Sequence, residues 1–336
     1  MPNKILYLGN KLSKSGKNIT TIESLSKKLS DLSYNVKSYS CKKHKLQRLF
    51  DMLLAVIRHK DSDYLIIDTY STSAFWFAYL SSRLALFYNI KYIPILHGGN
   101  LEKRLQKNPL LSDAYFSRAY INVAPSEFML DVFSLRGFKN LKRIPNPINI
   151  EDYPYKERKF IKPNIIWVRA FAEIYNPMMA IKVLEHLVKL YPEAVLCMVG
   201  PVKDKSYQKC RNYAEQNKLP VTFTGQLSKK EWISYTDDFD IFINTTTVDN
   251  TPLSVIEAMA LGLSVVSTNV GGLPYLIEDR HNGMLIQSND IEAMSDAIIE
   301  LMQKPELTHK ISKNARKFAS SYDWDIVKAE WDKILK

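Results

Sequence analysis

Residues 240–262 read DIFINTTTVDNTPLSVIEAMALG, and this stretch decides the fold class. It opens with a short apolar run, 240–244, of the kind that forms a buried strand. Pro252 then introduces an apolar run that ends at Leu261, and proline suits the first turn of a helix because its missing N–H has no intrahelical partner to lose. The order strand, loop, helix is the repeating unit of an α/β fold.

The same alternation runs through the whole chain of 336 residues. Further strands are expected at 4–10, 36–40, 64–68, 91–96, 120–124, 164–168, 195–200, 221–225, 264–268 and 284–287, most of which are short apolar runs. Helical patterns include those at 19–32, 42–60, 178–190 and 291–302. Strands that alternate with helices predict parallel, helix-covered sheets, and the length suits two doubly wound domains of roughly 150 residues each.

A polar, charged segment bracketed by prolines, YPYKERKFIKP at 153–163, is predicted to be the interdomain linker. We therefore expect an N-terminal domain over 1–155 and a C-terminal domain over 156–318. A last helix within 319–336 is expected to pack back on the N-terminal domain. Ligands of open α/β sheets bind outside the carboxyl ends of the strands, so a cleft between the two domains is the expected site.

Charge is divided unevenly along the chain. Residues 1–150 hold 23 Lys and Arg against 10 Asp and Glu, whereas residues 151–336 hold 23 against 25. The basic half is expected to face an anionic partner, and no motif for nucleic acid accompanies the charge. The three cysteines and six histidines show no metal-ligand spacing, so we expect no metal and no cofactor.

The start of the chain does not have the pattern of a signal peptide, and no apolar stretch reaches the roughly 18 residues of a membrane span. These features predict a cytoplasmic protein. Residues 42–60 nevertheless form a basic amphipathic pattern with Leu46, Leu49, Phe50, Leu53 and Ile57 on one face. Either this face packs on the first-domain sheet, or it lies on anionic lipid at the inner face of the membrane.

The first loop, GNKLSKSGKN at 9–18, fits neither nucleotide-binding motif. Six residues separate Gly9 from Gly16, two more than a Walker A loop allows, and G-x-G-x-x-G is absent. Gly9, Ser15 and Gly16 could still hold an anionic or hydroxylated ligand at a helix N-terminus. An ordinary strand-to-helix turn is the alternative.

Three further side chains are candidates from their positions. His97 follows the apolar strand of YIPILHGGN, which places an imidazole at the end of the sheet where sites lie. Asp249 falls in the loop after the strand at 240–244, and Glu257 lies in the helix that follows, with seven residues between the two acids. The free N–H groups of that helix start, 250–253, can hold a diphosphate.

The segment 249–257 resembles the E-x7-E signature of retaining glycosyltransferases of family 4, with Asp249 and Glu257 at the acidic positions. EAMALG, VVSTNVGGLP and HNGMLI follow in the family's order, and ILHGGN, VAPSEFMLDVF and RIPNPI match its first half. The resemblance implies the GT-B fold, two facing Rossmann-like domains with an interdomain cleft. It implies a retaining, metal-independent hexosyltransferase of bacterial surface polysaccharide or lipopolysaccharide synthesis.

The resemblance also implies roles for particular residues. Catalysis falls to His97, Arg169 and Asp249, with Arg169 neutralising the diphosphate. Gly9, Ser15 and Gly16 would lie on the acceptor side. The donor, a UDP- or GDP-linked sugar, would be bound by Tyr175, Asn176, Asn250, Thr251, Pro252, Leu253 and, at its ribose, Glu257.

This sequence departs from the family at one cationic position. Ile174 stands where the family carries a lysine, and Tyr175 and Asn176 could supply neutral hydrogen bonds in its place. The expected acceptor is a glycan or a lipid-linked glycan, with front-face transfer in which the departing phosphate helps to remove the acceptor proton. A nucleotide-sugar epimerase and a non-catalytic sugar-nucleotide-binding homologue remain as alternatives.

Overall fold

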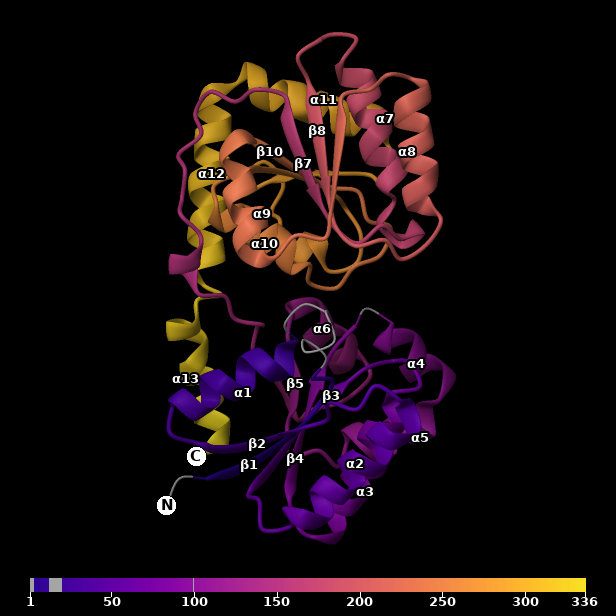
Figure 1. Cartoon of the computed structure of the whole chain (residues 1–336). Coiled ribbons are helices and arrows are strands. Elements are labelled where there is room, and N and C mark those ends of the chain that lie inside the picture. The colour runs from indigo at the N-terminus through magenta and orange to yellow at the C-terminus, as the bar shows by residue number, and fades with distance from the viewer. Residues whose placement is uncertain (1–2, 12–19, 99) are drawn as a thin grey trace. The chain divides into compact units, whose positions relative to one another are not determined.

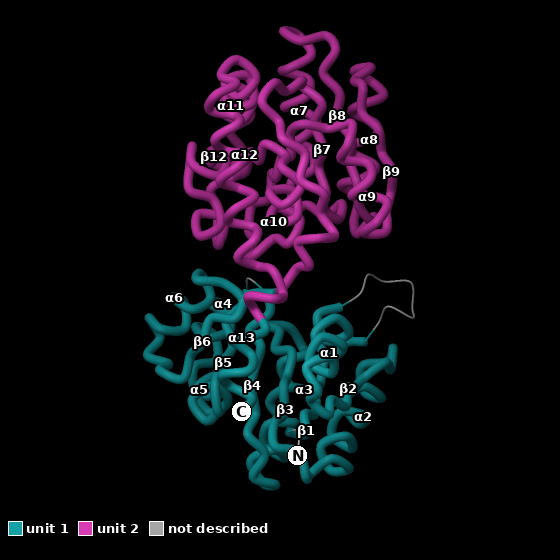
Figure 2. The backbone as a smooth tube through the Cα atoms, turned by 90° about the vertical axis from the view of Figure 1, so that its left-hand side faces the viewer, with its two compact units in different colours: residues 1–146, 328–336 teal, residues 147–327 magenta. Residues whose placement is uncertain are grey.

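The structure is a computed structural model that describes residues 3–11, 20–98 and 100–336. The chain divides into two compact units (Figure 2): unit 1 consists of residues 1–146 and 328–336, and unit 2 of residues 147–327. Each unit is an α/β domain around one parallel sheet of six strands. The predicted fold class is confirmed by these sheets.

Unit 1 has the strand order β2-β1-β3-β4-β5-β6, all parallel. Its strands are β1 (Lys4–Leu8), β2 (Asn35–Tyr39), β3 (Tyr64–Thr69), β4 (Lys91–Leu96), β5 (Asn122–Ala124) and β6 (Leu141–Arg143). Its helices are α1 (Thr21–Asp31), α2 (Lys45–Arg58), α3 (Phe75–Phe87), α4 (Leu101–Lys107), α5 (Pro109–Phe116), α6 (Glu127–Leu135) and most of α13 (Trp324–Leu335). Figure 1 shows these elements. β3 is buried along its whole length because helices cover both faces of the sheet.

Unit 2 has the strand order β12-β11-β10-β7-β8-β9, also all parallel. Its strands are β7 (Asn164–Val168), β8 (Val195–Val199), β9 (Val221–Gly225), β10 (Ile241–Asn244), β11 (Ser264–Thr268) and β12 (Met284–Ile286). Its helices are α7 (Pro177–Leu187), α8 (Ser206–Gln216), α9 (Lys229–Tyr235), α10 (Leu253–Ala260), α11 (Ile291–Gln303) and α12 (Pro305–Ser320). Short 3-10 turns lie at Ile150–Asp152, Glu173–Tyr175, Thr236–Asp238 and Leu273–Tyr275.

The core of unit 2 has one apolar cluster on each face of its sheet. Ile165 and Trp167 belong to one cluster, while Ile166 between them belongs to the other. This alternation follows from the two-residue period of a strand. It also explains why strands such as β7 and β8 appear in the sequence as nearly continuous apolar runs, since both of their faces are buried.

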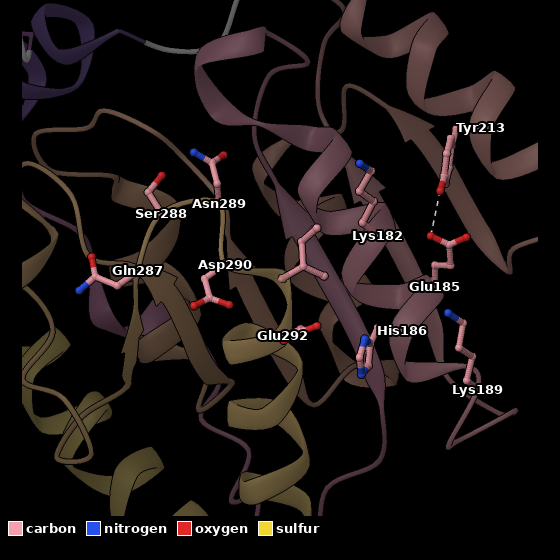
Figure 3. Close-up of a pocket in the computed structure, with 11 residues that line it drawn as sticks. Lys182, Glu185, His186, Lys189, Tyr213, Gln287, Ser288, Asn289, Asp290 and Glu292 are labelled. Atoms are coloured by element: carbon pink, nitrogen blue, oxygen red, sulfur yellow. Dashed lines mark hydrogen bonds between the residues drawn. The ribbon is translucent and has the colours of Figure 1, made fainter.

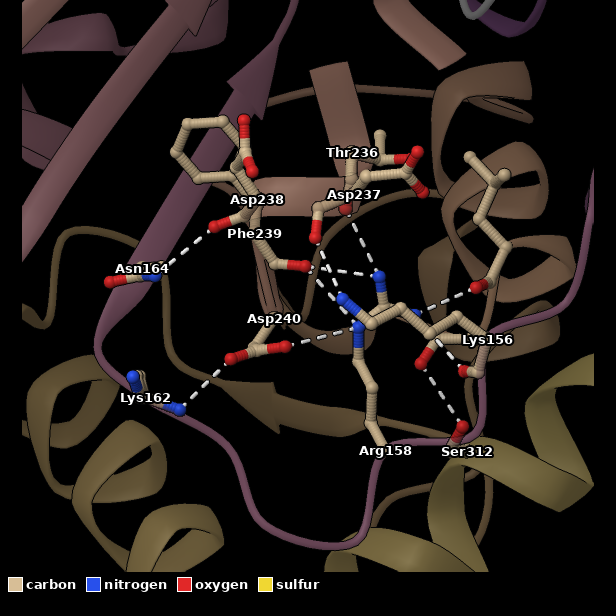
Figure 4. Close-up of polar contacts among 12 residues, drawn as sticks. Lys156, Arg158, Lys162, Asn164, Thr236, Asp237, Asp238, Phe239, Asp240 and Ser312 are labelled. Carbon is tan, nitrogen blue, oxygen red and sulfur yellow. Dashed lines mark hydrogen bonds and ion pairs between the residues drawn. The ribbon is translucent and has the colours of Figure 1, made fainter. Parts of the chain in front are cut away.

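The segment predicted as an interdomain linker, 153–163, is instead an integral part of unit 2 (Figure 4). Arg158 is only 3% exposed. Its guanidinium donates to the carbonyl oxygens of Phe239, Leu261 and Thr236, at 3.0, 2.8 and 3.1 Å. Asp240 Oδ1 lies 3.3 Å from Arg158 Nε and completes an ion pair. Arg158 can therefore be buried although it lies in a charged segment, because backbone carbonyls and one carboxylate satisfy its charge.

The boundaries of the units also differ from the expected ones, because segments on both sides of the predicted linker pack within unit 2. The chain passes from unit 1 to unit 2 at 146/147 and returns at 327/328, where the sequence analysis placed 155/156 and 318/319. Ile148 pairs with Asp323 within unit 2, and Tyr322 is buried in its core. The last helix, α13, contacts unit 1 through Asp332, which accepts from Tyr34 Oη at 2.9 Å.

Candidate functional site

A mostly buried charge pair of unit 2 lies at the carboxyl ends of two neighbouring strands. Arg169 follows β7 directly, and Asp249 lies in the loop after β10, which pairs with β7. Arg169 Nη2 and Asp249 Oδ2 form an ion pair, and both side chains are mostly buried. Burial lowers the pKa of Arg169 to about 10, and its guanidinium carbon stands 4.7 Å from the ring centre of Tyr175. The structure thus brings together two of the three residues predicted to be catalytic.

The three threonines after β10 fix the segment that carries Tyr175 and Asn176. Thr245 Oγ1 donates to the carbonyl oxygens of both residues, at 2.9 Å each. The carbonyl of Ile174 accepts from the N–H of Thr247 at 2.9 Å and from its Oγ1 at 3.0 Å. The backbone at position 174 is therefore held firmly, while the side chain of Ile174 is 41% exposed.

The start of α10 presents backbone N–H groups beside this pair. The N–H of Asn250 donates to Asp249 Oδ1 at 2.9 Å, and Thr251 Oγ1 donates to the Asn250 side-chain oxygen at 3.3 Å. Pro252 is the N-cap rather than the first helical residue, which is Leu253. Sequence reasoning placed this proline one position too far into the helix, an offset common at helix ends.

Two glycines of the following loop pack against this helix start. A Cβ on Gly271 would collide with the carbonyl of Asp249, and one on Gly272 with the carbonyl of Asn250. The N–H of Gly272 donates to the Asp249 carbonyl at 3.0 Å. Side chains at these two positions would displace the acidic loop, so the glycines are required for its position.

Some buried polar atoms at this edge of the sheet have no hydrogen-bond partner among the described residues. They include Nε of Arg169 and Oγ of Ser254, the second residue of α10. An unsatisfied buried donor costs about 1–3 kcal/mol. Such a cluster is expected where a polar ligand binds. Sequence reasoning missed Ser254, although its place one residue into the helix start was a signal.

Glu257 is the fifth residue of α10 and only 8% exposed. The hydroxyl of Tyr153 donates to its Oε1 at 2.5 Å. Lys229 Nζ lies 3.5 Å from the same oxygen and 4.6 Å from the centre of the Tyr153 ring. Burial raises the pKa of Glu257, whereas Tyr153 and Lys229 act in the opposite direction. Sequence reasoning missed both partners, because Tyr153 was assigned to a linker and Lys229 to no motif.

Unit 1 holds a second polar cluster at the carboxyl ends of its strands. His97 follows β4, and its Nε2 lies 3.0 Å from Oδ1 of Asp68, near the end of β3. The hydroxyl of Tyr7, in β1, donates to the same oxygen at 2.8 Å. The ring of Tyr70 stacks on the imidazole with centroids 5.2 Å apart. Burial and the Asp68 charge raise the pKa of Tyr7, so its phenol stays a proton donor to the carboxylate.

Gly9 lies beside this cluster. A Cβ at Gly9 would collide with the carboxylate of Asp68, so the glycine allows the first loop to pass close to the acid. Ser15 and Gly16, the other two residues predicted on the acceptor side, lie outside the described residues. Asp68 itself was missed in the sequence, although it closes the apolar run YLIID.

A separate depression of unit 2 contains none of the predicted residues (Figure 3). It lies between α7 and the chain that leads into α11, and Tyr213 donates to Glu185 at 2.9 Å across one side. Its lining mixes Lys182, His186 and Lys189 with Glu185 and Glu292. The opposing charges at its wall favour no one class of ligand.

Two searches of the described residues concern metals and membranes. Within residues 3–11, 20–98 and 100–336, no group of three or more His, Cys, Asp or Glu side chains could hold a metal ion. Over the same ranges, none of the helices is both long and apolar enough to cross a membrane.

The two α/β units, each built around a parallel sheet of six strands, define the class of this protein. The class is the GT-B fold of glycosyltransferases. A family model for glycosyl transferases group 1 matches residues 151–318. The chain belongs to this family.

Curated relatives carry the same kind of name. An uncharacterized glycosyltransferase of Haemophilus influenzae is 31% identical over 156 residues, 46% of this chain and 44% of that protein. The sulfoquinovosyl transferase SQD2 of Arabidopsis thaliana is 30% identical over 148 residues, 43% of this chain and 28% of that protein. The matched segments therefore span less than half the length of these relatives.

Solved structures agree over the whole length. Sucrose-phosphate synthase from Thermosynechococcus elongatus superposes with a TM-score of 0.79 at 14% identity and covers 99% of this chain and 98% of that one. Anabaena Alr3699/HepE, solved in complex with UDP-glucose, gives a TM-score of 0.74 at 16% identity, with 98% of both chains covered. At these identities the likeness establishes the fold.

Proposed function

We propose that this chain transfers a hexose from a UDP- or GDP-linked sugar to a glycan or lipid-linked acceptor, with retention of configuration, in bacterial surface polysaccharide synthesis. The observation that carries the proposal is the edge of the unit 2 sheet, where a buried Arg169 and the N-terminal end of α10 offer positive charge and unpartnered donors. Charge of this kind suits a diphosphate. The UDP complexes of the Anabaena protein lend support to a nucleotide-sugar donor.

In this proposal the protein mainly stabilises the leaving diphosphate. Arg169 and the backbone of 250–253 bind its oxygens, and Glu257 binds the ribose hydroxyls. No metal is needed, because the guanidinium and the helix dipole supply the positive charge. We assign front-face transfer, in which the acceptor oxygen attacks on the side from which the diphosphate leaves and no carboxylate of the protein acts as nucleophile. The leaving phosphate then takes the acceptor proton.

We assign His97 to contact with the transferred sugar and the loop of Gly9, Ser15 and Gly16 to the acceptor side. The reaction is placed in the cytoplasm, with peripheral contact to the inner face of the membrane. A lipid-linked acceptor would lie there, and the basic first half of the chain favours an anionic surface.

Thermal shift with UDP, GDP and their sugar conjugates tests the donor site. A nucleotide at 100 times its Kd should stabilise the protein by about 2.7 kcal/mol, a shift of several degrees. We expect one base to give this shift in the wild type and Glu257→Ala to lose it. No shift with any nucleotide would favour a homologue without a donor site, in which Ile174 marks the loss of diphosphate binding.

Product analysis then separates transfer from epimerisation. Transfer consumes the donor only when acceptor is present and releases the nucleoside diphosphate. An epimerase would yield a new nucleotide sugar with no dependence on acceptor. Donor binding without either product would support the alternative of a non-catalytic sugar-nucleotide-binding homologue.

A further inference from the structure

Helix α2 has two apolar sides, and only one of them is used for packing. Met52, Ala55 and Val56 are buried against unit 1. On the other side Leu46, Phe50, Leu54 and Ile57 are 61, 63, 45 and 43% exposed. The face predicted from the sequence therefore does not simply pack on the sheet: Leu46, Phe50 and Ile57 point outward, and Leu49 and Leu53 are half-buried.

Helix α3 repeats this arrangement. Phe75, Ala78 and Ala85 are buried, whereas Trp76, Leu80 and Phe87 are 49, 36 and 75% exposed. Their spacing of four and seven residues places them in one line along the helix. The described residues of unit 1 leave this second apolar line largely uncovered on both helices.

The two exposed lines face the same way. α2 and α3 lie side by side (Figure 1). Their crossovers, from β2 to β3 and from β3 to β4, both run in the same direction along the sheet order β2-β1-β3-β4. Right-handed crossovers then put both helices on one face of the sheet. Because each buries its sheet-facing side, their outward sides form one surface, here termed the α2–α3 face: Leu46, Phe50, Leu54, Ile57, Trp76, Leu80 and Phe87.

Cations surround this face almost without acids. Residues 42–60 and 75–87 contain seven Lys and Arg and a single acidic residue, Asp51. The exposed cations are Lys42, Lys43, Lys45, Arg58, Lys60 and Arg83. A second copy of the chain would bring this charge against itself, which disfavours self-association. Nucleic acid would use the cations but leave the exposed aliphatic side chains without a partner.

We propose that the α2–α3 face docks unit 1 on an anionic membrane surface. The aliphatic and aromatic side chains enter the boundary between headgroups and acyl chains, and the surrounding cations bind lipid phosphates. Trp76 suits that boundary because its ring is apolar and its N–H can reach water. This docking rests on the membrane contact of the proposed function and names the surface that makes it, whereas its evidence, the exposed side chains of α2 and α3, is independent of the donor site in unit 2.

Co-sedimentation with vesicles tests the proposal on the full chain. The probes are phosphatidylcholine vesicles with and without phosphatidylglycerol. We expect the wild type to bind only the anionic vesicles, and more weakly as salt is raised. The double variant Phe50→Glu/Phe87→Glu should bind at least about tenfold more weakly, since it removes two inserting rings and adds repulsive charge.

The matched control is Phe160→Glu, an aromatic residue of unit 2 that is 78% exposed. It should bind vesicles like the wild type. The nucleotide-induced thermal shift should persist in all variants, which shows that each is folded and keeps the two proposals apart.

Equal binding to neutral vesicles, equal binding by the double variant, or no vesicle binding by the wild type would each overturn the docking. So would a wild-type dimer in light scattering that Phe50→Glu converts to monomer, because the face would then be a contact between copies.

Discussion

The polar clusters of the two units occupy equivalent places, at the carboxyl ends of parallel strands, but the chain builds them differently. In unit 2 Asp249 and Glu257 come from one strand–loop–helix segment, and Arg169, directly after the adjacent strand β7, pairs with Asp249. In unit 1 three strands supply one side chain each: Tyr7 from β1, Asp68 from β3 and His97 from just beyond β4. A contiguous motif reveals the first kind of cluster, whereas only the sheet order reveals the second.

The clusters also differ in charge. In unit 2 the buried cation Arg169 and the start of α10 lie beside the carboxylate of Asp249. A more highly charged ligand could replace that carboxylate beside the cation. Unit 1 holds an imidazole against a carboxylate that a phenol also satisfies. We therefore expect the unit 2 cluster to bind most of the negative charge of the ligand. We expect the unit 1 cluster to orient the imidazole ring of His97.

Removing the unit 2 cation should have the largest effect. Arg169→Ala is expected to lower kcat at least about a hundredfold, as the loss of a donor to developing charge does. The measurement is steady-state transfer with the donor that thermal shift identifies. Arg169→Lys is the control, since it keeps the charge but loses the planar fork, and it should retain part of the rate. Near-normal turnover of Arg169→Ala would contradict the proposal that Arg169 binds the diphosphate.

Much of the fold could be predicted because its determinants are local. Among the described residues, eleven of the twelve strands coincide with strands expected from the sequence, most of them apolar runs, and the exception, β6, is the polar edge strand LKR. In unit 2 the positions of Asp249 and Glu257, in a loop and the helix after it, followed from one contiguous segment of the sequence. By contrast, Arg158 and Tyr153 lie in a charged, proline-bracketed stretch whose burial depends on partners about a hundred residues away. No local pattern could reveal these contacts.

The orienting contact of unit 1 should have a smaller effect. Asp68→Asn keeps the size of the side chain but removes the charge that fixes the His97 ring, and we expect kcat to fall about tenfold, near the lower end for a hydrogen bond to a charged group. The affinity for donor measured by thermal shift should change little. In a His97→Ala background Asp68→Asn should cost nothing further, because the acid acts through the imidazole. An equal additional loss there would show a separate role for Asp68.

The smallest effect tests whether a residue outside the motif shapes the unit 2 cluster. Tyr153→Phe keeps the ring that Lys229 contacts but leaves Glu257 Oε1 without its hydroxyl donor. The Kd for nucleotide should rise about fivefold, which corresponds to about 1 kcal/mol, the net worth of one hydrogen bond. Tyr155→Phe is the matched control, because the Tyr155 hydroxyl lies 3.3 Å from Ser312 Oγ.

The dependence of that Kd on pH distinguishes positioning of Glu257 from general packing. Burial raises the pKa of Glu257, and the Tyr153 hydroxyl opposes this rise, so the variant should have the higher pKa. Protonation gives a neutral, weaker acceptor for ribose hydroxyls, and affinity should therefore fall as pH is lowered. In Tyr153→Phe this fall should begin at a higher pH than in the wild type or Tyr155→Phe. Parallel pH curves with only a constant offset would mean that Tyr153 supports the fold of unit 2 without setting the ionisation of Glu257.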